Sequence, residues 1–391
     1  MRTVALVIPW YGQGTGGAEL AAQELAEHCC RRGYRVEVLT TCCRSPYDDW
    51  SSNALAAGRE ILNGVAVHRF PVAPRDADAY HAVNYKFIHH LPVSREECTR
   101  YMENNINSHE LMAFISREQE RYWFVFTPFP FGTSYWGHTI APRVSFLMPH
   151  LHDEPLAHTE NIREMFHRVR GVLFNTPVDQ ALAERLFGLP RERGGVMGGG
   201  VETEGWAMAE RWRARHRLGD PFVLYVGKKQ AAKNVDMLVE YFVEYKRRYG
   251  GPLKLVLLGP EGMALSEAAR RYVLDIGATS KEERDDAYAA SSVFCQPSCN
   301  ESFSRVLMEA WLAGKPALVH EGCEVTSWHC RQSNGGLYFH DARMFAACLE
   351  YYLQHPREAE MIGAQGREYV LRNYHYDGLW RVSGLFRVAG E

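Results

Sequence analysis

Four consecutive stretches near the start of the chain decide its fold: residues 4–8 (VALVI), 12–17 (GQGTGG), 18–32 and 36–40 (VEVLT). The first is a continuous apolar run rich in β-branched residues, which is typical of a strand buried on both faces of a sheet. The third stretch repeats its apolar residues at helical spacing. A strand, a glycine loop, a helix and a second strand in this order predict a βαβ unit with parallel strands.

The same alternation restarts in the second half of the chain, after a segment at 191–200 that holds five glycines. Apolar strand patterns at 222–226, 253–258, 293–295 and 317–320 alternate there with helical patterns. This predicts an α/β protein of two doubly wound, Rossmann-like domains facing each other across a cleft. We place the N-terminal domain at 1–200 and the C-terminal domain at 201–370, with a helix over 371–391 packing back on the first domain.

Composition excludes several classes of protein. The 391 residues are enough for two domains, and 46% of them are hydrophobic, as in ordinary globular proteins. Lys and Arg number 44 against 47 Asp and Glu, so no basic field attracts nucleic acid. We see no signal peptide and no apolar run of the roughly 18 residues that span a membrane.

The ten cysteines show no disulfide framework, so we expect reduced thiols and a cytoplasmic protein. A zinc site is the alternative, because four cysteines and two histidines lie between 295 and 330. The paired CxxC spacing of a structural zinc site is missing, which favours small buried side chains and no metal.

The first glycine loop, Gly12-x-Gly14-x-x-Gly17, has the spacing and context of a dinucleotide fingerprint. A dehydrogenase also needs a carboxylate at the end of the second strand, but that strand runs into Thr40 and Thr41. The dehydrogenase interpretation is therefore disfavoured. The loop remains a source of backbone amides for an anionic group at a helix N-terminus.

The strongest signal is a pair of glutamates, Glu301 and Glu309, eight positions apart. In a continuous helix they would be about 12 Å apart along the axis and about 80° around it, too far to share a proton. They could instead hold two ends of an elongated ligand. The amides of Phe303, Ser304 and Arg305 between them would then meet a phosphate. The alternative is an ordinary solvated helix face.

Two further clusters follow predicted strands. Gly227, Lys228 and Lys233 come directly after the first strand of the second domain, where α/β sheets bind ligands, and two cations suit a diphosphate. His152 follows a strand of the first domain. Surface lysines and hydrogen-bonded structural histidines are the alternatives.

In their order along the chain, these residues resemble the retaining nucleotide-sugar glycosyltransferases of family 4, which have the GT-B fold. The match covers nearly the whole chain. Lys228 stands where that family usually has arginine, and Ser302 and Ser304 replace glycines that often flank the phenylalanine. The matching segments are Gly16-Gly17-Ala18-Glu19, the strand 63–70, His152-Asp153-Glu154-Pro155, Gly199-Gly200-Val201-Glu202, Lys228, Lys233, Glu301 and Glu309.

The resemblance implies a role for each matching residue. Lys228 and Lys233 would neutralise the diphosphate of a UDP- or GDP-sugar, and Glu309 would bind the ribose. Glu301 and His152 would lie at the donor sugar. Backbone amides at Gly16, Gly17, Phe303, Ser304 and Arg305 would hold phosphate oxygens, and Gly227 would be a further donor-binding residue. The family retains anomeric configuration without an established protein nucleophile, so none is assigned.

The resemblance also implies a biological setting. Chains with Asp153-Glu154-Pro155 and Asn334-Gly335-Gly336-Leu337 look like bacterial cell-envelope or O-antigen enzymes, which predicts a saccharide or lipid-linked acceptor. Arginines over 163–193 are consistent with peripheral contact at the inner membrane face, although a solvated basic face explains them as well. Asp76-Ala77-Asp78 is interpreted as a chance DxD. The alternatives are a catalytically silent nucleotide-sugar-binding partner and a GT-B epimerase or phosphorylase.

Overall fold

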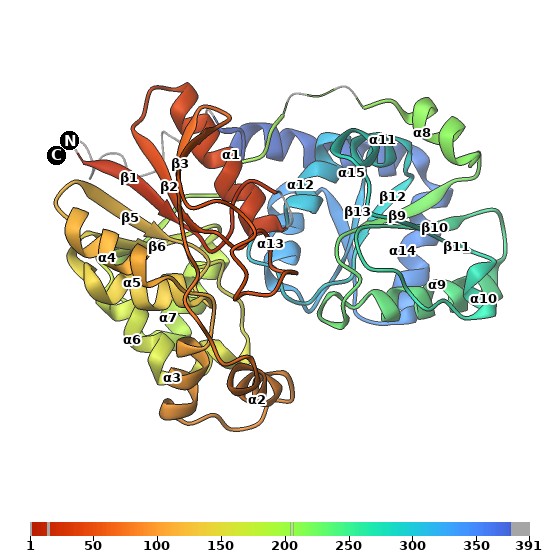
Figure 1. Cartoon of the computed structure of the whole chain (residues 1–391). Coiled ribbons are helices and arrows are strands. Elements are labelled where there is room, and N and C mark those ends of the chain that lie inside the picture. Colours follow the sequence, from red (N-terminus) through yellow and green to blue (C-terminus); the bar gives the residue numbers. More distant parts are fainter. Residues whose placement is uncertain (1, 14–15, 204, 206, 377–391) are drawn as a thin grey trace. The chain divides into compact units, whose positions relative to one another are not determined.

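The computed structural model describes residues 2–13, 16–203, 205 and 207–376. The chain divides between Gly200 and Val201 into two compact units, and each unit contains one sheet with helices on both faces (Figure 1). Unit 1 contains the N-terminal 200 residues and unit 2 begins at Val201. The fold is the predicted one, an α/β protein with two Rossmann-like domains.

The sheet of unit 1 has the strand order β3-β4-β2-β1-β5-β6-β7-β8. All neighbouring strands pair in parallel except β3, which is antiparallel to β4. The chain builds outward from β1 on one side and then from β5 on the other, so the topological switch lies between β1 and β5. The strands are β1 (Thr3–Val7), β2 (Val36–Thr41), β3 (Gly58–Leu62), β4 (Val65–Phe70), β5 (Tyr122–Phe126), β6 (Ser145–Leu147), β7 (Gly171–Phe174) and β8 (Gly194–Val196).

The residues of β1 alternate between two cores. Val4 and Leu6 pack under α1, whereas Ala5 and Val7 belong to the larger core that the later helices of unit 1 cover. Because both faces of β1 are buried, its residues form the unbroken apolar run seen in the sequence. The helices are α1 (Gly17–Arg31), α2 (Ala77–Ile88), α3 (Arg95–Glu103), α4 (His109–Glu118), α5 (Gly132–Ile140), α6 (Glu160–Arg168) and α7 (Pro177–Phe187), with short 3₁₀ turns η1 (Pro142–Val144), η2 (Pro155–His158) and η3 (Arg191–Arg193).

Unit 1 contains two helices, α2 and α5, that the sequence analysis did not predict. The supposed DxD explains the first of them. The Asp76 side chain accepts a hydrogen bond from the Ala79 amide at 3.0 Å and so caps α2, while Asp78 lies in its first turn. The aspartates at this position therefore begin a helix.

The sheet of unit 2 is fully parallel, with the order β11-β10-β9-β12-β13-β14. Its topological switch lies between the central strands β9 and β12, because β10 and β11 extend the sheet on one side and β13 and β14 on the other. The strands are β9 (Phe222–Val226), β10 (Lys254–Leu258), β11 (Val273–Gly277), β12 (Val293–Gln296), β13 (Ala317–His320) and β14 (Gly336–Phe339).

The helices of unit 2 cover the two sheet faces in two groups. Phe222 and Leu224 of β9 face a core shared with α8, α11, α12 and α15, and Val223 and Tyr225 face the other core, under α9, α10 and α14. The helices are α8 (Ala209–His216), α9 (Val235–Tyr249), α10 (Glu267–Arg270), α11 (Lys281–Ala290), α12 (Arg305–Leu312), α13 (Glu324–Ser333), α14 (Ala342–Gln354) and α15 (Pro356–Asn373), with the 3₁₀ turn η4 (Ala231–Lys233).

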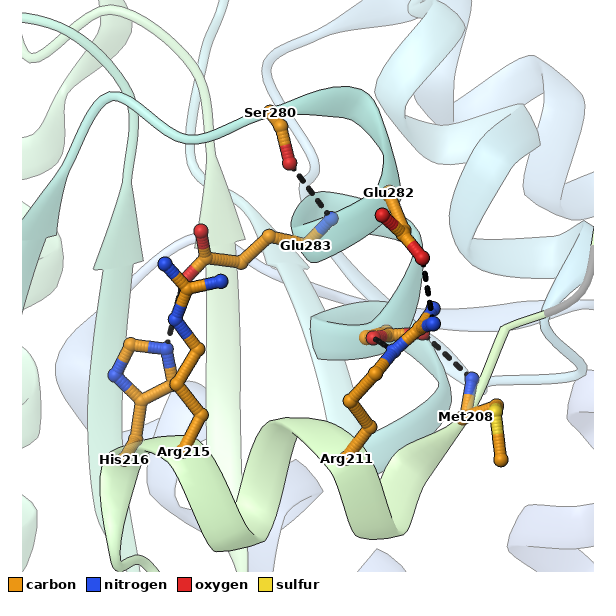
Figure 2. Close-up of polar contacts among 8 residues, drawn as sticks. Met208, Arg211, Arg215, His216, Ser280, Glu282 and Glu283 are labelled. Carbon is orange, nitrogen blue, oxygen red and sulfur yellow. Dashed lines mark hydrogen bonds and ion pairs between the residues drawn. The ribbon is translucent and has the colours of Figure 1, made fainter.

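Helix α8 is held on α11 by ion pairs. Figure 2 shows Arg211 reaching Glu282, and the same guanidinium contacts Asp286. His216 lies 2.9 Å from Glu283, and Trp212 is buried against Phe222 at a ring distance of 4.8 Å. These contacts hold α11 in place, and α11 carries two side chains of the candidate site.

The chain enters unit 2 beside α15. The Val201 amide donates to the Tyr374 carbonyl at 3.1 Å, and Val201 forms an isolated parallel bridge with His375. The predicted helix over 371–391 does not begin at 371, because residues 371–373 are the last turn of α15. From residue 377 onward that predicted helix lies outside the described residues.

Candidate functional site

The loops after β9 and β12 flank the topological switch of unit 2. Open α/β sheets bind ligands at this point, because loops leaving neighbouring strands in opposite directions open a crevice at their carboxyl ends. Gly227 and Lys228 follow β9 directly, and the segment from Pro297 to Ser304 follows β12. The structure therefore brings the lysine cluster and the glutamate motif to one edge of one sheet.

Two glycines let the loops after β9 and β10 meet. Gly227 has φ +152 and Gly259 has φ +136, and a Cβ on Gly259 would lie 1.9 Å from the Gly227 carbonyl oxygen. The Lys229 side chain is fully buried here and bonds the Gly259 carbonyl at 2.5 Å and Asp275 at 2.9 Å. Lys229 therefore fixes these loops and is not a candidate cation for a ligand.

Lys233 and Glu301 form the centre of the candidate site. Lys233 Nζ lies 2.7 Å from Glu301 Oε1, which also accepts a hydrogen bond of 2.8 Å from Gln296 Nε2. The Lys233 side chain is 30% exposed and that of Glu301 13%. The ion pair is therefore open enough for a ligand to contact both charges.

Asn234 ties the two loops of this ion pair together. Its backbone is left-handed, with φ 54, and its Nδ2 donates to the Pro297 carbonyl at 3.2 Å and to Cys299 Sγ at 3.1 Å. Cys299 Sγ in turn lies 3.4 Å from His320 Nδ1. Burial raises the pKa of Cys299 and lowers that of His320, so this is a neutral hydrogen-bond chain. Sequence reasoning did not find Asn234.

The N-terminus of α12 is the third part of the site. The helix begins at Arg305, so Glu301 lies in the loop before it, and the continuous helix considered for Glu301 and Glu309 does not occur. Ser304 is the N-cap residue with φ 62, and among the described residues its buried Oγ has no hydrogen-bond partner. Phe303 anchors this turn, with ring distances of 5.1 Å to Tyr374 and 5.7 Å to His329.

A residue with positive φ before a helix turns successive backbone amides outward, and the first amides of a helix have no partner within it. The positive end of α12, from Phe303 to Arg305, therefore favours a bound anion. Glu309 lies one turn further on. Its Oε2 accepts a hydrogen bond of 3.1 Å from the Tyr288 hydroxyl and lies 3.5 Å from Arg284 Nε, both on α11.

In unit 1 the predicted glycine loop lies at the switch between β1 and β5. Gly16 is the N-cap of α1 and Gly17 its first residue, and a Cβ on either would meet nothing within 4 Å. Glu19 is buried in the first turn and accepts a hydrogen bond of 2.9 Å from the Gln13 amide, which fixes the loop. Residues 14 and 15 lie outside the described residues.

The histidine region follows β6. His152 is half-buried, and the preceding His150 has φ 53 and an Nδ1 atom 3.1 Å from Asn175 Nδ2. Burial lowers the pKa of His150 to about 4, so this imidazole is neutral at physiological pH. Sequence reasoning assigned a role to His152 and none to His150.

The metal alternative finds no support in the described part of the chain, where no cluster of three or more His, Cys, Asp or Glu side chains could hold an ion. The cysteines between 295 and 330 are placed differently from one another. Cys295, Cys323 and Cys330 are buried, and Cys299 accepts a hydrogen bond from Asn234.

Residues 208–369 match the family model for glycosyl transferases group 1. That segment lies wholly within unit 2 and includes Lys228, Lys233, Glu301 and Glu309. The curated D-inositol 3-phosphate glycosyltransferase of Acidothermus cellulolyticus is 26% identical over 415 residues, covering 100% of this chain and 89% of that protein. The enzyme of the same name from Streptomyces bingchenggensis is 30% identical over 188 residues, covering 43% of this chain and 41% of that protein.

Solved structures share the whole fold at low identity. Sucrose-phosphate synthase from Thermosynechococcus elongatus has a TM-score of 0.73 and 18% identity, covering 100% of this chain and 99% of that chain. HepE from Anabaena, solved with UDP-glucose, has a TM-score of 0.71 and 13% identity, covering 99% of this chain and 100% of that chain. The group 1 match, together with the two Rossmann-like units, identifies a hexose-transferring glycosyltransferase with the GT-B fold.

Proposed function

We propose that this glycosyltransferase is a retaining enzyme of family 4 that moves a sugar from a UDP- or GDP-sugar to a saccharide or lipid-linked acceptor. The observation that carries the proposal is the edge of the unit 2 sheet, where Lys233, Glu301 and the N-terminus of α12 meet. Cations and a helix N-terminus at one sheet edge suit a diphosphate. The UDP-glucose bound to HepE, which shares the fold, supports this class of donor.

Lys228 and Lys233 stabilise the diphosphate as the sugar departs. Negative charge on the leaving group grows in the transition state, so a cation at this place lowers the barrier more than it strengthens ground-state binding. The amides of Phe303, Ser304 and Arg305 bind phosphate oxygens, and Gly227, directly after β9, is a further contact with the donor.

The two carboxylates bind hydroxyl groups. Glu309 accepts hydrogen bonds from the ribose, in an orientation fixed by Tyr288 and Arg284. Glu301 contacts the donor sugar, and the hydrogen bond from Gln296 to its Oε1 orients the carboxylate. From unit 1, His152 contacts the sugar, and the amides of Gly16 and Gly17 contact the phosphate. No protein nucleophile is assigned, and catalysis rests on positioning and on stabilisation of the leaving group.

We further propose a role in bacterial envelope polysaccharide synthesis at the inner face of the cytoplasmic membrane. The support is the resemblance of Asp153-Glu154-Pro155 and Asn334-Gly335-Gly336-Leu337 to envelope enzymes. In the described chain, no helix combines the length and the apolar composition that a membrane crossing needs.

The test has two steps. A thermal-shift screen with UDP, GDP, ADP and TDP identifies the base, because a ligand that binds the folded state raises the unfolding midpoint. Incubation with the matching sugar nucleotides then measures nucleotide release. We expect a stabilising nucleotide and slow release by hydrolysis without acceptor. Binding without turnover under any condition would favour the alternative, a catalytically silent binding partner.

A further inference from the structure

Unit 1 contains a cavity of ≈ 560 Å³ that has no part in the proposed donor site. It lies between the connection from α2 to α3 and the segment that runs from Asp153 into α6. Its volume falls within the roughly 300–1,000 Å³ of small-molecule sites. It begins one residue after His152, whose carbonyl accepts a hydrogen bond of 3.0 Å from the Glu154 amide.

The two walls differ in chemistry. One wall is apolar, formed by Phe87, Leu91, Pro92 and Val93. The opposite wall carries hydrogen-bonding groups, among them Glu154, Thr159 and Asn161. An apolar face opposite a polar one suits a sugar ring, which presents C–H groups on its faces and hydroxyls at its edge.

Two of the basic side chains that line the cavity, Arg95 and His158, already contact carboxylates. Arg95 contacts Glu164 at 2.8 Å, and His158 Nε2 lies 2.7 Å from Asp153 Oδ1. Asp153 also forms an ion pair with Arg185 at 3.1 Å, which holds this segment against α7. A phosphate in this cavity would have to compete with these carboxylates, since His90 is the remaining basic group of the lining.

Glu154 differs from the other acidic groups of the cavity. It is half-buried, and among the described residues its carboxyl has no ion-pair or hydrogen-bond partner, so that burial raises its pKa to about 7. An incompletely satisfied carboxyl on the wall of a cavity is a ready acceptor for ligand hydroxyls. The titratable and charged groups around it are Asp153, His158, Glu160, Arg95, His90 and, on α3, Tyr101.

We propose that this cavity binds the acceptor and selects a neutral, hydroxyl-rich molecule, a saccharide, over a phosphorylated one, with Glu154 accepting its hydroxyls. The inference rests on the proposed function. It separates this chain from the curated relatives, which are named for D-inositol 3-phosphate.

The test uses the sugar nucleotide that passes the donor screen and two sets of acceptor probes. One set contains the methyl glycosides of glucose, galactose, mannose and N-acetylglucosamine. The other contains glucose 6-phosphate, mannose 6-phosphate and inositol 3-phosphate. We expect a neutral probe to accelerate nucleotide release with a kcat/KM at least tenfold above that of any phosphorylated probe.

Two variants locate the effect. Glu154→Gln is isosteric, and at pH 8 it should lower kcat/KM for the neutral probe about tenfold, well beyond any change in hydrolysis without acceptor. Leu91→Trp narrows the cavity from its exposed apolar side and should act in the same direction. Glu103→Gln, an exposed carboxylate at the end of α3, is the charge-matched control.

A preference for phosphorylated probes, no acceleration by any neutral probe, or an unchanged acceptor KM in both cavity variants would overturn the proposal. Failure of the donor proposal gives a different result, the absence of any thermal shift or hydrolysis. Saturation-transfer NMR with the methyl glycosides remains informative in that case, because it detects binding without turnover. A signal in wild type that is lost in Glu154→Gln supports the cavity, and equal signals overturn it.

Discussion

Lys233 Nζ and Glu301 Oε1 lie 2.7 Å apart although 68 residues separate them in the chain. The contact joins the loop after β9 to the loop after β12, the two strands that flank the topological switch of unit 2. Asn234 reinforces the same junction from the next residue. A ligand with a negative diphosphate and a hydroxyl-bearing sugar can engage both members of the pair.

Lys233→Ala should lower kcat about 10²–10³-fold with a smaller change in the donor KM, because the charge that Lys233 stabilises grows in the transition state. Steady-state nucleotide release at saturating donor measures it. Lys254→Ala is the control, since Lys254 is half-buried at the start of β10, where its Nζ donates to the Arg271 carbonyl at 3.1 Å. Unchanged turnover in Lys233→Ala would refute its role.

Glu309→Ala should weaken nucleotide binding by roughly tenfold to a hundredfold, as expected for the loss of charged hydrogen bonds to ribose, with a smaller effect on kcat. Tyr288→Phe removes only the 3.1 Å bond that orients the carboxylate, so we expect a loss of a few-fold. Isothermal titration with the nucleotide measures both. If kcat collapses while affinity is unchanged, Glu309 does not bind the ribose.

Asn234→Gly keeps the left-handed backbone but removes the side-chain bonds to Pro297 and Cys299. We expect kcat/KM to fall by up to about tenfold, the equivalent of roughly 1.4 kcal/mol, with a thermal midpoint close to wild type. The matched control is Asn334→Gly, because Asn334 has φ 52 at the end of α13, outside the candidate site. Equal activity of the two variants would remove Asn234 as a positioning residue.

Glu154 should make stability depend on pH in a defined direction. Its folded pKa of about 7 lies above the roughly 4.3 of an unfolded glutamate, so the folded state holds more protons between these values. The stability of the wild type therefore falls as the pH rises through 7. Glu154→Gln has no titrating group at this position and does not show this loss. Its free energy of unfolding relative to that of wild type should therefore rise by about 1–3 kcal/mol between pH 5 and pH 8, a range that allows for partial solvent contact.

Urea unfolding of both proteins at pH 5, 6.5 and 8 measures the difference, with Glu103→Gln showing the effect of an exposed carboxylate. A Glu154→Gln variant that loses stability relative to wild type at pH 8 would show that the carboxyl is ionised and stabilised in the folded protein. That result would also mean that the Glu154 carboxyl is not the incompletely satisfied hydrogen-bond acceptor that the proposed cavity requires.

Local patterns were sufficient for the strands of the two sheet centres. The run before Pro9 and the run before Gly227 are apolar throughout because both faces of a central parallel strand are buried. Patterns failed at the periphery. Strand β3, the edge strand at 58–62, is mostly exposed, and α2 begins at an aspartate cap in a segment rich in aspartate and proline. At such places the pairing of strands and the capping of helices, and not the local composition, decide the secondary structure.

The candidate site shows the same division. The motif residues Lys228, Lys233, Glu301 and Glu309 could be chosen from sequence because each follows a strand or a helix start. Their partners could not be chosen. Nothing in the local pattern distinguishes Lys229, which is fully buried and bonds Gly259, from the neighbouring Lys228. The same is true of Tyr288, which reaches Glu309 from another helix.

The sequence by itself determined the alternation of strands and helices at the two sheet centres and which charged residues follow those strands, since these depend on periodicity and on glycine. Only the tertiary structure decided which of those charges meet, which are buried by another loop, and where unit 1 is hollow. Contacts between residues tens of positions apart depend on the strand order of each sheet, and no short-range pattern encodes that order.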